Sequence, residues 1–212
     1  MVHVSDHEGL LRARDGGEQH VTPLELFLDL VYVFAVTQLS HRLLVHLTIG
    51  NALETLLLLV VVWSAWISTT WVTNWFDPDR LAVRLMLIAV MLASLLMSVA
   101  IPEAFGERGL MFALAYVAIQ VGRTAFVLIA LGGNHPLSRT FQRVVSWYVA
   151  SGVLWIMGGL LDGGARYVLW GLALTADVCG PVTGYWTPGL GRSRTGEWTI
   201  EGVVNHDVPQ GM

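Results

Sequence analysis

The chain has 212 residues, of which 54% are hydrophobic and 13% are charged, and its mean hydropathy is +0.60. Soluble domains carry about 25% charged residues, so this composition excludes a soluble globular protein and indicates a membrane protein. The single cysteine, Cys179, excludes a disulfide scaffold. A net charge of −4 argues against nucleic acid as a partner, because nucleic-acid-binding proteins are usually basic.

The predicted elements begin after a polar tail, residues 1–22. Six apolar stretches follow, and each is close to the roughly 20 residues that a helix needs to cross the bilayer core. They cover residues 24–47, 52–73, 81–101, 110–131, 144–161 and 167–185. The connections are short and rich in Gly, Pro, Asn and Asp, which predicts antiparallel neighbours. We therefore expect an all-α fold, a polytopic transmembrane helix bundle of about six spans over residues 23–186, followed by a polar tail, 187–212.

The arginines predict the orientation of this bundle. Successive loops lie on alternate sides of the membrane. This alternation places eight arginines on the same side as the N-terminus, namely Arg12, Arg14, Arg80, Arg84, Arg139, Arg143, Arg192 and Arg194. The other side receives Arg42, Arg108 and Arg166. Cytoplasmic loops carry the excess of Arg and Lys, so both termini are predicted to be cytoplasmic.

The first apolar stretch contains two acidic residues, Glu25 and Asp29, which lie one helical turn apart on one face. Two neighbouring carboxylates in a membrane could form a proton relay or a cation site. The alternative for Glu25 is a structural role at the first turn of the helix, just after Pro23.

Arg123 lies inside the fourth stretch, about 12 Å from its end at Leu131. Gln120 is on the same face, and Asp177 in the sixth stretch is at a similar predicted depth. We therefore expect Arg123 and Asp177 to form a buried ion pair, with Asp29 as a competing partner. Such a pair either fixes helix packing or belongs, with Glu25, Asp29 and Gln120, to a substrate or ion pathway.

One face of the second stretch carries Trp63, Trp66, Thr70 and Asn74. This face either lines a cavity or serves for packing and interface anchoring. His41 and His46 are five residues apart, which does not suit two metal ligands on one helical face, so we expect no metal site. The chain contains none of the motifs G-x-S-x-G, H-E-x-x-H and C-x-x-C, so neither an enzyme nor a cofactor is predicted.

Three ordered blocks resemble a known family. The first is H-V-T-P-L-E-L-F-L-D-L-V-Y-V-F-A, from His20 to Ala35. The second is W-V-T-N-W-F-D-P-D-R-L-A-V-R, from Trp71 to Arg84, and the third, within 169–202, contains L-W-G-L-A-L-T-A-D, P-G-L-G-R-S and E-W-T-I-E-G. Together they resemble the bacterial low temperature requirement A (LtrA) family. The resemblance implies a multi-pass protein of the bacterial inner membrane and a role in growth at low temperature.

The resemblance also implies that the chain is truncated at its C-terminus, because the family usually continues with further hydrophobic helices. The leading hypothesis is a transporter or channel-like protein with a polar intramembrane core, whose partners are the lipid bilayer and an unknown small solute or ion. The alternatives are a membrane-embedded enzyme acting on lipid, a structural or interaction subunit, and a non-functional fragment. Association into a homo-oligomer is left open.

Overall fold

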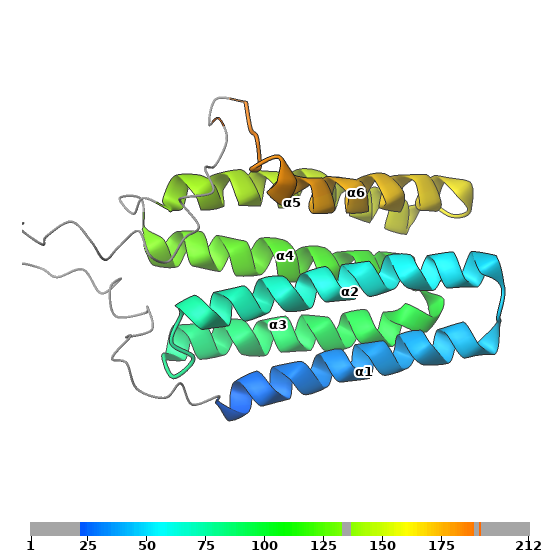
Figure 1. The fold of residues 1–212 in the computed structure, drawn as a ribbon, viewed down its shortest axis with the longest axis horizontal. Helices are drawn as coiled ribbons and strands as arrows, with labels where there is room; N and C mark the ends of the chain where they lie inside the picture. Colours follow the sequence, from blue (N-terminus) through cyan, green and yellow to red (C-terminus); the bar gives the residue numbers. More distant parts are fainter. Residues whose placement is uncertain (1–21, 133–136, 189–190, 192–212) are drawn as a thin grey trace, which may run out of the picture.

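The computed structural model describes residues 22–132, 137–188 and 191, and these residues form a bundle of helices (Figure 1). The elements are α1 (Pro23–Val45), α2 (Ile49–Trp75), α3 (Leu81–Ala100), the short 3-10 helix η2 (Ile101–Glu103), α4 (Gly109–Leu131), α5 (Ser138–Leu160) and α6 (Gly164–Val182). The predicted all-α fold is confirmed. Within the described ranges, α1 to α5 are long and apolar enough to cross a membrane. The predicted tails lie almost wholly outside the described residues.

Local chemistry fixes where the helices begin. Thr22 and Glu25 form a capping box at α1, in which each side chain accepts a hydrogen bond from the other residue's backbone N–H. The Thr48 side chain caps α2 in a similar way. α5 begins at Ser138, six residues before the predicted span, because its first two turns are polar and lack the apolar character used to find it.

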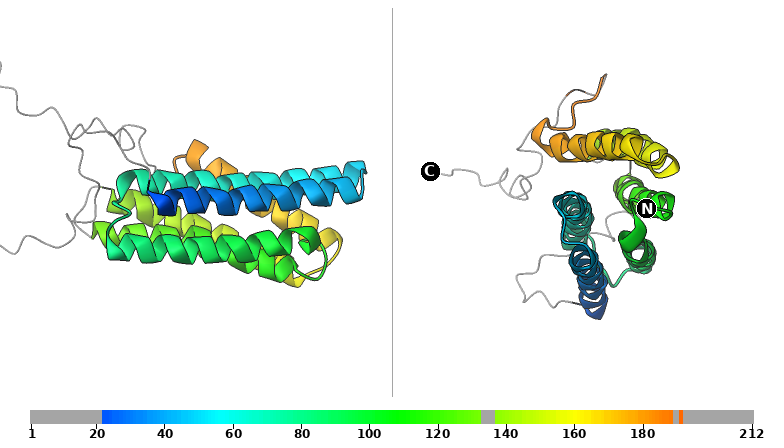
Figure 2. Two further views of the ribbon diagram at one scale, coloured as in Figure 1. Left: turned by 90° about the horizontal axis from the view of Figure 1, so that it is seen from below. Right: turned by 90° about the vertical axis from the view of Figure 1, so that its right-hand side faces the viewer.

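Neighbouring helices run antiparallel and pack in an order close to that of the sequence. α4 contacts α3 on one side and α5 on the other, α6 packs on α5, and α1 packs on both α2 and α3. Figure 2 shows this arrangement from the side and from one end. The largest buried side chains include Trp155, Trp170, Tyr116 and Phe112, which fill the space between α4, α5 and α6. Exposed leucines and valines cover the outside of the bundle, as expected of a surface that contacts lipid.

The two ends of the bundle differ. We call them the Arg166 end, where α6 begins, and the Trp75 end, where α2 ends. At the Arg166 end, the guanidinium of Arg166 donates hydrogen bonds to the backbone carbonyls of Ala104, Gly106, Gly158 and Leu161. These carbonyls come from the loop after η2 and from the end of α5, so Arg166 ties the two connections together.

α6 ends well before the other helices do (Figure 1). Its last turn contains Pro181, and the next residues turn sharply with φ of 64° at Gly184 and 49° at Tyr185. The indole N–H of Trp147 donates to the carbonyl of Trp186 at 3.0 Å. Trp147 lies nine residues, or about 13 Å, beyond the start of α5, so α6 ends that far inside the Trp75 end. The predicted span 167–185 therefore extends too far, since the helix stops at Val182.

Candidate functional site

Arg123 projects from α4 into the middle of the bundle, where its side chain is only 2% exposed. Its guanidinium donates hydrogen bonds to the hydroxyl of Thr69 at 3.0 Å and to the Ala65 carbonyl at 3.3 Å, both on α2. A further hydrogen bond runs to the side-chain oxygen of Gln120, one turn earlier on α4. None of these acceptors is charged, and Arg123 forms no ion pair with any residue that the structure describes.

Gln120 connects Arg123 to an acidic group on the other side of α4. The Gln120 amide donates to the Tyr116 hydroxyl at 3.1 Å, and this hydroxyl donates to a carboxylate oxygen of Asp177 at 3.0 Å. The indole of Trp155 on α5 donates to the same oxygen at 3.0 Å. A chain of polar side chains therefore runs from α2 through α4 to α6, and we call it the polar chain: Thr69, Arg123, Gln120, Tyr116 and Asp177.

The prediction of a direct ion pair between Arg123 and Asp177 is wrong. The predicted depth of Asp177 assumes that the sixth span continues to residue 185, but α6 ends at Val182 and this end lies deep inside the bundle. Asp177 consequently lies at the level of Tyr116, seven residues or about 10 Å along α4 from Arg123. The side chains of Gln120 and Tyr116 bridge the distance between Arg123 and Asp177.

The acidic residues of α1 lie apart from this polar chain. Glu25 completes the capping box with Thr22, as the structural alternative in the sequence analysis described. Asp29 is exposed and accepts a hydrogen bond from the indole of Trp66 at 2.9 Å, so it does not compete for Arg123. The structure thus brings together three of the five predicted pathway residues, namely Gln120, Arg123 and Asp177.

The structure also places the face of α2 that carries Trp63, Trp66, Thr70 and Asn74. Trp63 is 56% exposed, and its ring packs against Trp66 at a centroid distance of 5.2 Å. Thr70 bonds to a carbonyl of its own helix, and Asn74 is exposed. None of these four residues lines the pocket beside Arg123. The residues of α2 that line this pocket lie on the neighbouring face of the helix, which points toward α4 and α5.

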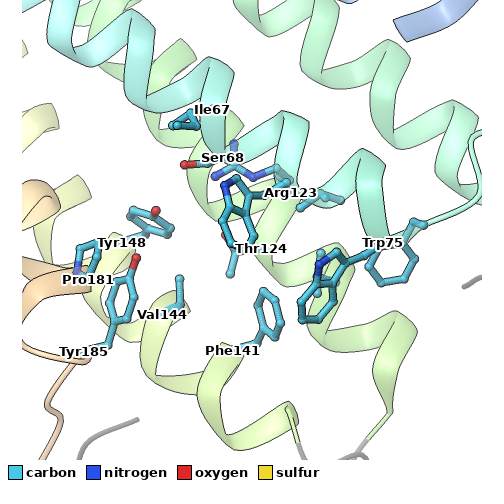
Figure 3. A pocket seen from close by; sticks show the side chains of 14 residues that line it. Ile67, Ser68, Trp75, Arg123, Thr124, Phe141, Val144, Tyr148, Pro181 and Tyr185 are labelled. Carbon is cyan, nitrogen blue, oxygen red and sulfur yellow. The ribbon is translucent and has the colours of Figure 1, made fainter. Parts of the chain in front are cut away.

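The pocket beside Arg123 has a volume of about 470 Å³ (Figure 3). Its walls come from the second half of α2, from α4, from the first half of α5 and from the end of α6. The fourteen lining residues are Ile67, Ser68, Trp71, Val72, Trp75, Phe76, Arg123, Thr124, Val127, Phe141, Val144, Tyr148, Pro181 and Tyr185. We call this space the Arg123 pocket. Among the described residues that line it, Arg123 is the only charged one.

Sequence reasoning missed several residues of the site. Thr69 and Trp155 hold the two charged members of the polar chain, but a Thr and a Trp in an apolar helix give no distinctive signal. Tyr185 enters the pocket wall because α6 stops early, and its hydroxyl faces that of Tyr148 in Figure 3. The sequence of the turn, Gly180-Pro181 followed by Gly184, is the one signal that could have indicated this end.

The bundle of long apolar helices with a charged interior defines the chain as a multi-pass helical membrane protein. The profile of the bacterial low temperature requirement A protein (LtrA) matches residues 20–204, and the chain belongs to this family.

The chain is also similar to an uncharacterized protein of Rhizobium meliloti (strain 1021), with 40% identity over 198 residues. The match covers 93% of this chain and 48% of that protein, so the chain spans about half the length of this relative. No solved structure matches the chain.

Proposed function

We propose that the protein is a membrane transport protein, whose polar chain forms part of the path of a small solute or ion. The observation that carries the proposal is the buried Arg123, which is held by neutral acceptors and connected to Asp177 only through Gln120 and Tyr116. An ionisable side chain in the hydrocarbon region costs at least about 2.5 kcal/mol, so two of them in one bundle need a functional reason or a compensating partner.

The early end of α6 supports the same proposal. Non-helical backbone at membrane depth is tolerated where it is buried in protein or lines a water-filled cavity. Interrupted helices beside a central site are also common in transporters. Here the turn after α6 places Tyr185 in the wall of the Arg123 pocket. Binding and passage of a solute, without a covalent reaction, is the activity that we propose for this arrangement.

The proposed location is the bacterial inner membrane, with the Trp75 end and both termini in the cytoplasm. The support is the arginine distribution together with membership of a bacterial membrane protein family. We further propose that the protein is required for growth at low temperature, as the name of the family indicates.

The transport proposal can be tested in liposomes that contain the purified protein and dyes that report pH and membrane potential. Gradients of protons, sodium, potassium and chloride are imposed in turn. We expect a flux above that of protein-free liposomes, and we expect Tyr116→Phe to reduce it at least tenfold by interrupting the polar chain. Tyr167→Phe is the control, because it also removes a tyrosine hydroxyl, one that donates a hydrogen bond to Glu54 near the Arg166 end, outside the polar chain. Equal flux in protein-containing and protein-free liposomes, for these ions and for the organic acids considered below, would overturn the proposal.

The proposed physiological role needs a separate test. A strain that lacks the gene is grown at the optimal temperature and in the cold, with and without a plasmid copy. We expect a growth defect confined to the cold, which the wild-type copy corrects and the Arg123→Gln copy does not. Equal growth of the deletion strain and its parent in the cold would contradict this role.

A further inference from the structure

The Arg123 pocket carries an unbalanced positive charge. Its lining contains one guanidinium and no carboxylate, and Arg123 forms no ion pair within the described part of the chain. Arginine stays protonated in proteins, so it cannot escape the cost of burial by losing its proton. Removing the partner of a buried charge is strongly destabilising, and a buried cation therefore favours a bound anion.

Two hydrogen-bond donors in the pocket wall remain without an acceptor among the described residues. The Nε–H of Arg123 makes no hydrogen bond, since the three bonds of the guanidinium all come from its terminal nitrogens. The indole nitrogen of Trp75 is buried and has no partner. Both residues are labelled in the wall of the pocket in Figure 3. The Trp75 N–H is the buried one of the two, and buried donors are normally satisfied, so it points to an acceptor that a ligand supplies.

Apart from the hydroxyl groups of Ser68, Thr124, Tyr148 and Tyr185, the rest of the pocket lining is apolar and aromatic. Trp75 is the last residue of α2, and Phe141 is in the first turn of α5, so both lie near the Trp75 end. Arg123 lies eight residues, or about 12 Å, deeper along α4. A ligand in this pocket meets its positive charge at the bottom and aromatic rings nearer the end of the bundle.

We propose that the Arg123 pocket binds an organic acid, with its single carboxylate at Arg123 and an apolar or aromatic body among the rings of Trp71, Trp75 and Phe141. A planar guanidinium matches the two oxygens of a carboxylate, and a volume of about 470 Å³ is in the range of small-molecule sites. This inference names the substrate class of the transport proposed above and, for the transport step alone, rests on that proposal.

The acid can come from two sources, and both have the same recognition chemistry. Ile67 and Trp71, at the edge of the pocket, are 40% and 50% exposed on the apolar outside of α2, which fits entry of a fatty acid from the bilayer. A water-soluble aromatic acid would instead enter from the Trp75 end. The test therefore uses 3-phenylpropanoate as the soluble probe and palmitoleate, supplied in phosphatidylcholine vesicles, as the bilayer probe.

Equilibrium binding of each radiolabelled acid is measured on the purified protein in lipid nanodiscs. We expect saturable binding of at least one acid, with its methyl ester at least tenfold weaker because the ester lacks the negative charge. Arg123→Gln should weaken binding of the acid at least tenfold without changing that of the ester. Arg84→Gln is the matched control, because Arg84 lies on the exposed surface and pairs with Asp79. Equal affinity for acid and ester, or equal binding of the acid by Arg123→Gln and wild type, would overturn the inference.

A second variant keeps the inference testable if Arg123→Gln fails to fold. Trp75→Phe keeps an aromatic ring and removes the unpartnered N–H together with part of the indole. We expect a melting temperature close to that of the wild type, at least threefold weaker binding of the acid, and a smaller loss for the methyl ester. Unchanged binding by this variant would contradict the inference. Acid binding without uptake into liposomes supports the site and counts against transport. Flux of inorganic ions without acid binding supports transport and overturns the site.

Discussion

Arg123 and Arg166 are both buried, but their surroundings give them different roles. Arg166 is 3% exposed and donates to five backbone carbonyls at distances from 2.6 to 3.5 Å, in addition to its ion pair with Asp162. All three nitrogens of its guanidinium donate hydrogen bonds, and these bonds hold two loops together. Arg123 has fewer acceptors and borders an open pocket. A buried arginine in a membrane protein is therefore structural or functional according to how many of its donors the protein itself satisfies.

Substitution of Arg166 tests its structural role. Arg166→Gln leaves several buried carbonyls without a donor, so we expect the free energy of unfolding to fall by at least about 2 kcal/mol. Asp162→Asn should lower it by less than about 1 kcal/mol, because an exposed ion pair contributes little and the Asp162 side chain is 88% exposed. Melting temperatures in detergent measure both effects. Equal losses in the two variants would show that the ion pair, and not the set of carbonyls, holds Arg166.

A double-mutant cycle tests the polar chain. Arg123 and Gln120 are in direct contact, so Arg123→Gln and Gln120→Ala should show a coupling energy of about 0.5–3 kcal/mol. Arg123→Gln and Asp177→Asn act on residues that do not touch, and their effects should be closer to additive. Thermal stability of the single and double variants provides the measurement. Stronger coupling of Arg123 to Asp177 than to Gln120 would restore the direct pair that the depth estimate predicted.

At the scale of helices, close packing between α4 and α5 depends on small residues. A Cβ atom on Gly159 would lie 2.9 Å from the Cα of Leu110 and 3.1 Å from the Gly109 carbonyl oxygen. Both of these atoms belong to the backbone of α4 and cannot move aside like a flexible side chain. Gly159 therefore sets the distance between the two helices, as small residues commonly do in membrane bundles.

Alanine substitutions at Gly159 and Gly171 should change the stability of the protein in opposite directions. Gly159→Ala forces α4 and α5 apart, and overpacking of this kind costs about 1–3 kcal/mol. Gly171, in α6, has open space around its Cβ position. Gly171→Ala should therefore stabilise the helix by about 0.5–1 kcal/mol, since alanine favours helix more than glycine does. Melting temperatures that fall equally in both variants would contradict the role assigned to Gly159.

At the scale of the whole molecule, the proposed orientation makes a prediction about every loop. Reporter fusions after Gly50, Gly106 and Gly164 should report the outside of the cell. Fusions after Pro78, Gly133 and Gly191 should report the cytoplasm, because the loops richest in arginine stay inside. Reporter activity on intact cells measures the side of each site. The reverse pattern at all six sites would overturn the orientation, while a reversal at Gly191 alone would show that the chain after α6 does not return to the cytoplasm.

The sequence predicted the helices well and the contacts between them poorly. Apolar stretches show how long a helix is, and the predicted bounds of α3 and α4 differ from the observed ones by only one residue at any end. Depth along a helix can be counted in the same way, provided that the helix end is known. The early end of α6 decided that Asp177 meets Tyr116. The rotation of each helix cannot be counted, and the rotation of α2 decided that the Trp63 face lies away from the pocket. The composition of the site was therefore predictable for Gln120, Arg123 and Asp177, but their partners were not.

The unequal helix lengths have a consequence for the surrounding lipid. α2 has 27 residues and is about 40 Å long, whereas α6 has 19 residues and is about 28 Å long. We expect a bilayer with a hydrocarbon core of about 30 Å to thin slightly beside α6, and we expect α2 to tilt. Cooling orders acyl chains and thickens the bilayer, which increases the mismatch at α6. We expect the melting temperature in phosphatidylcholine liposomes to fall as monounsaturated acyl chains are lengthened, and a constant melting temperature across the series would contradict this.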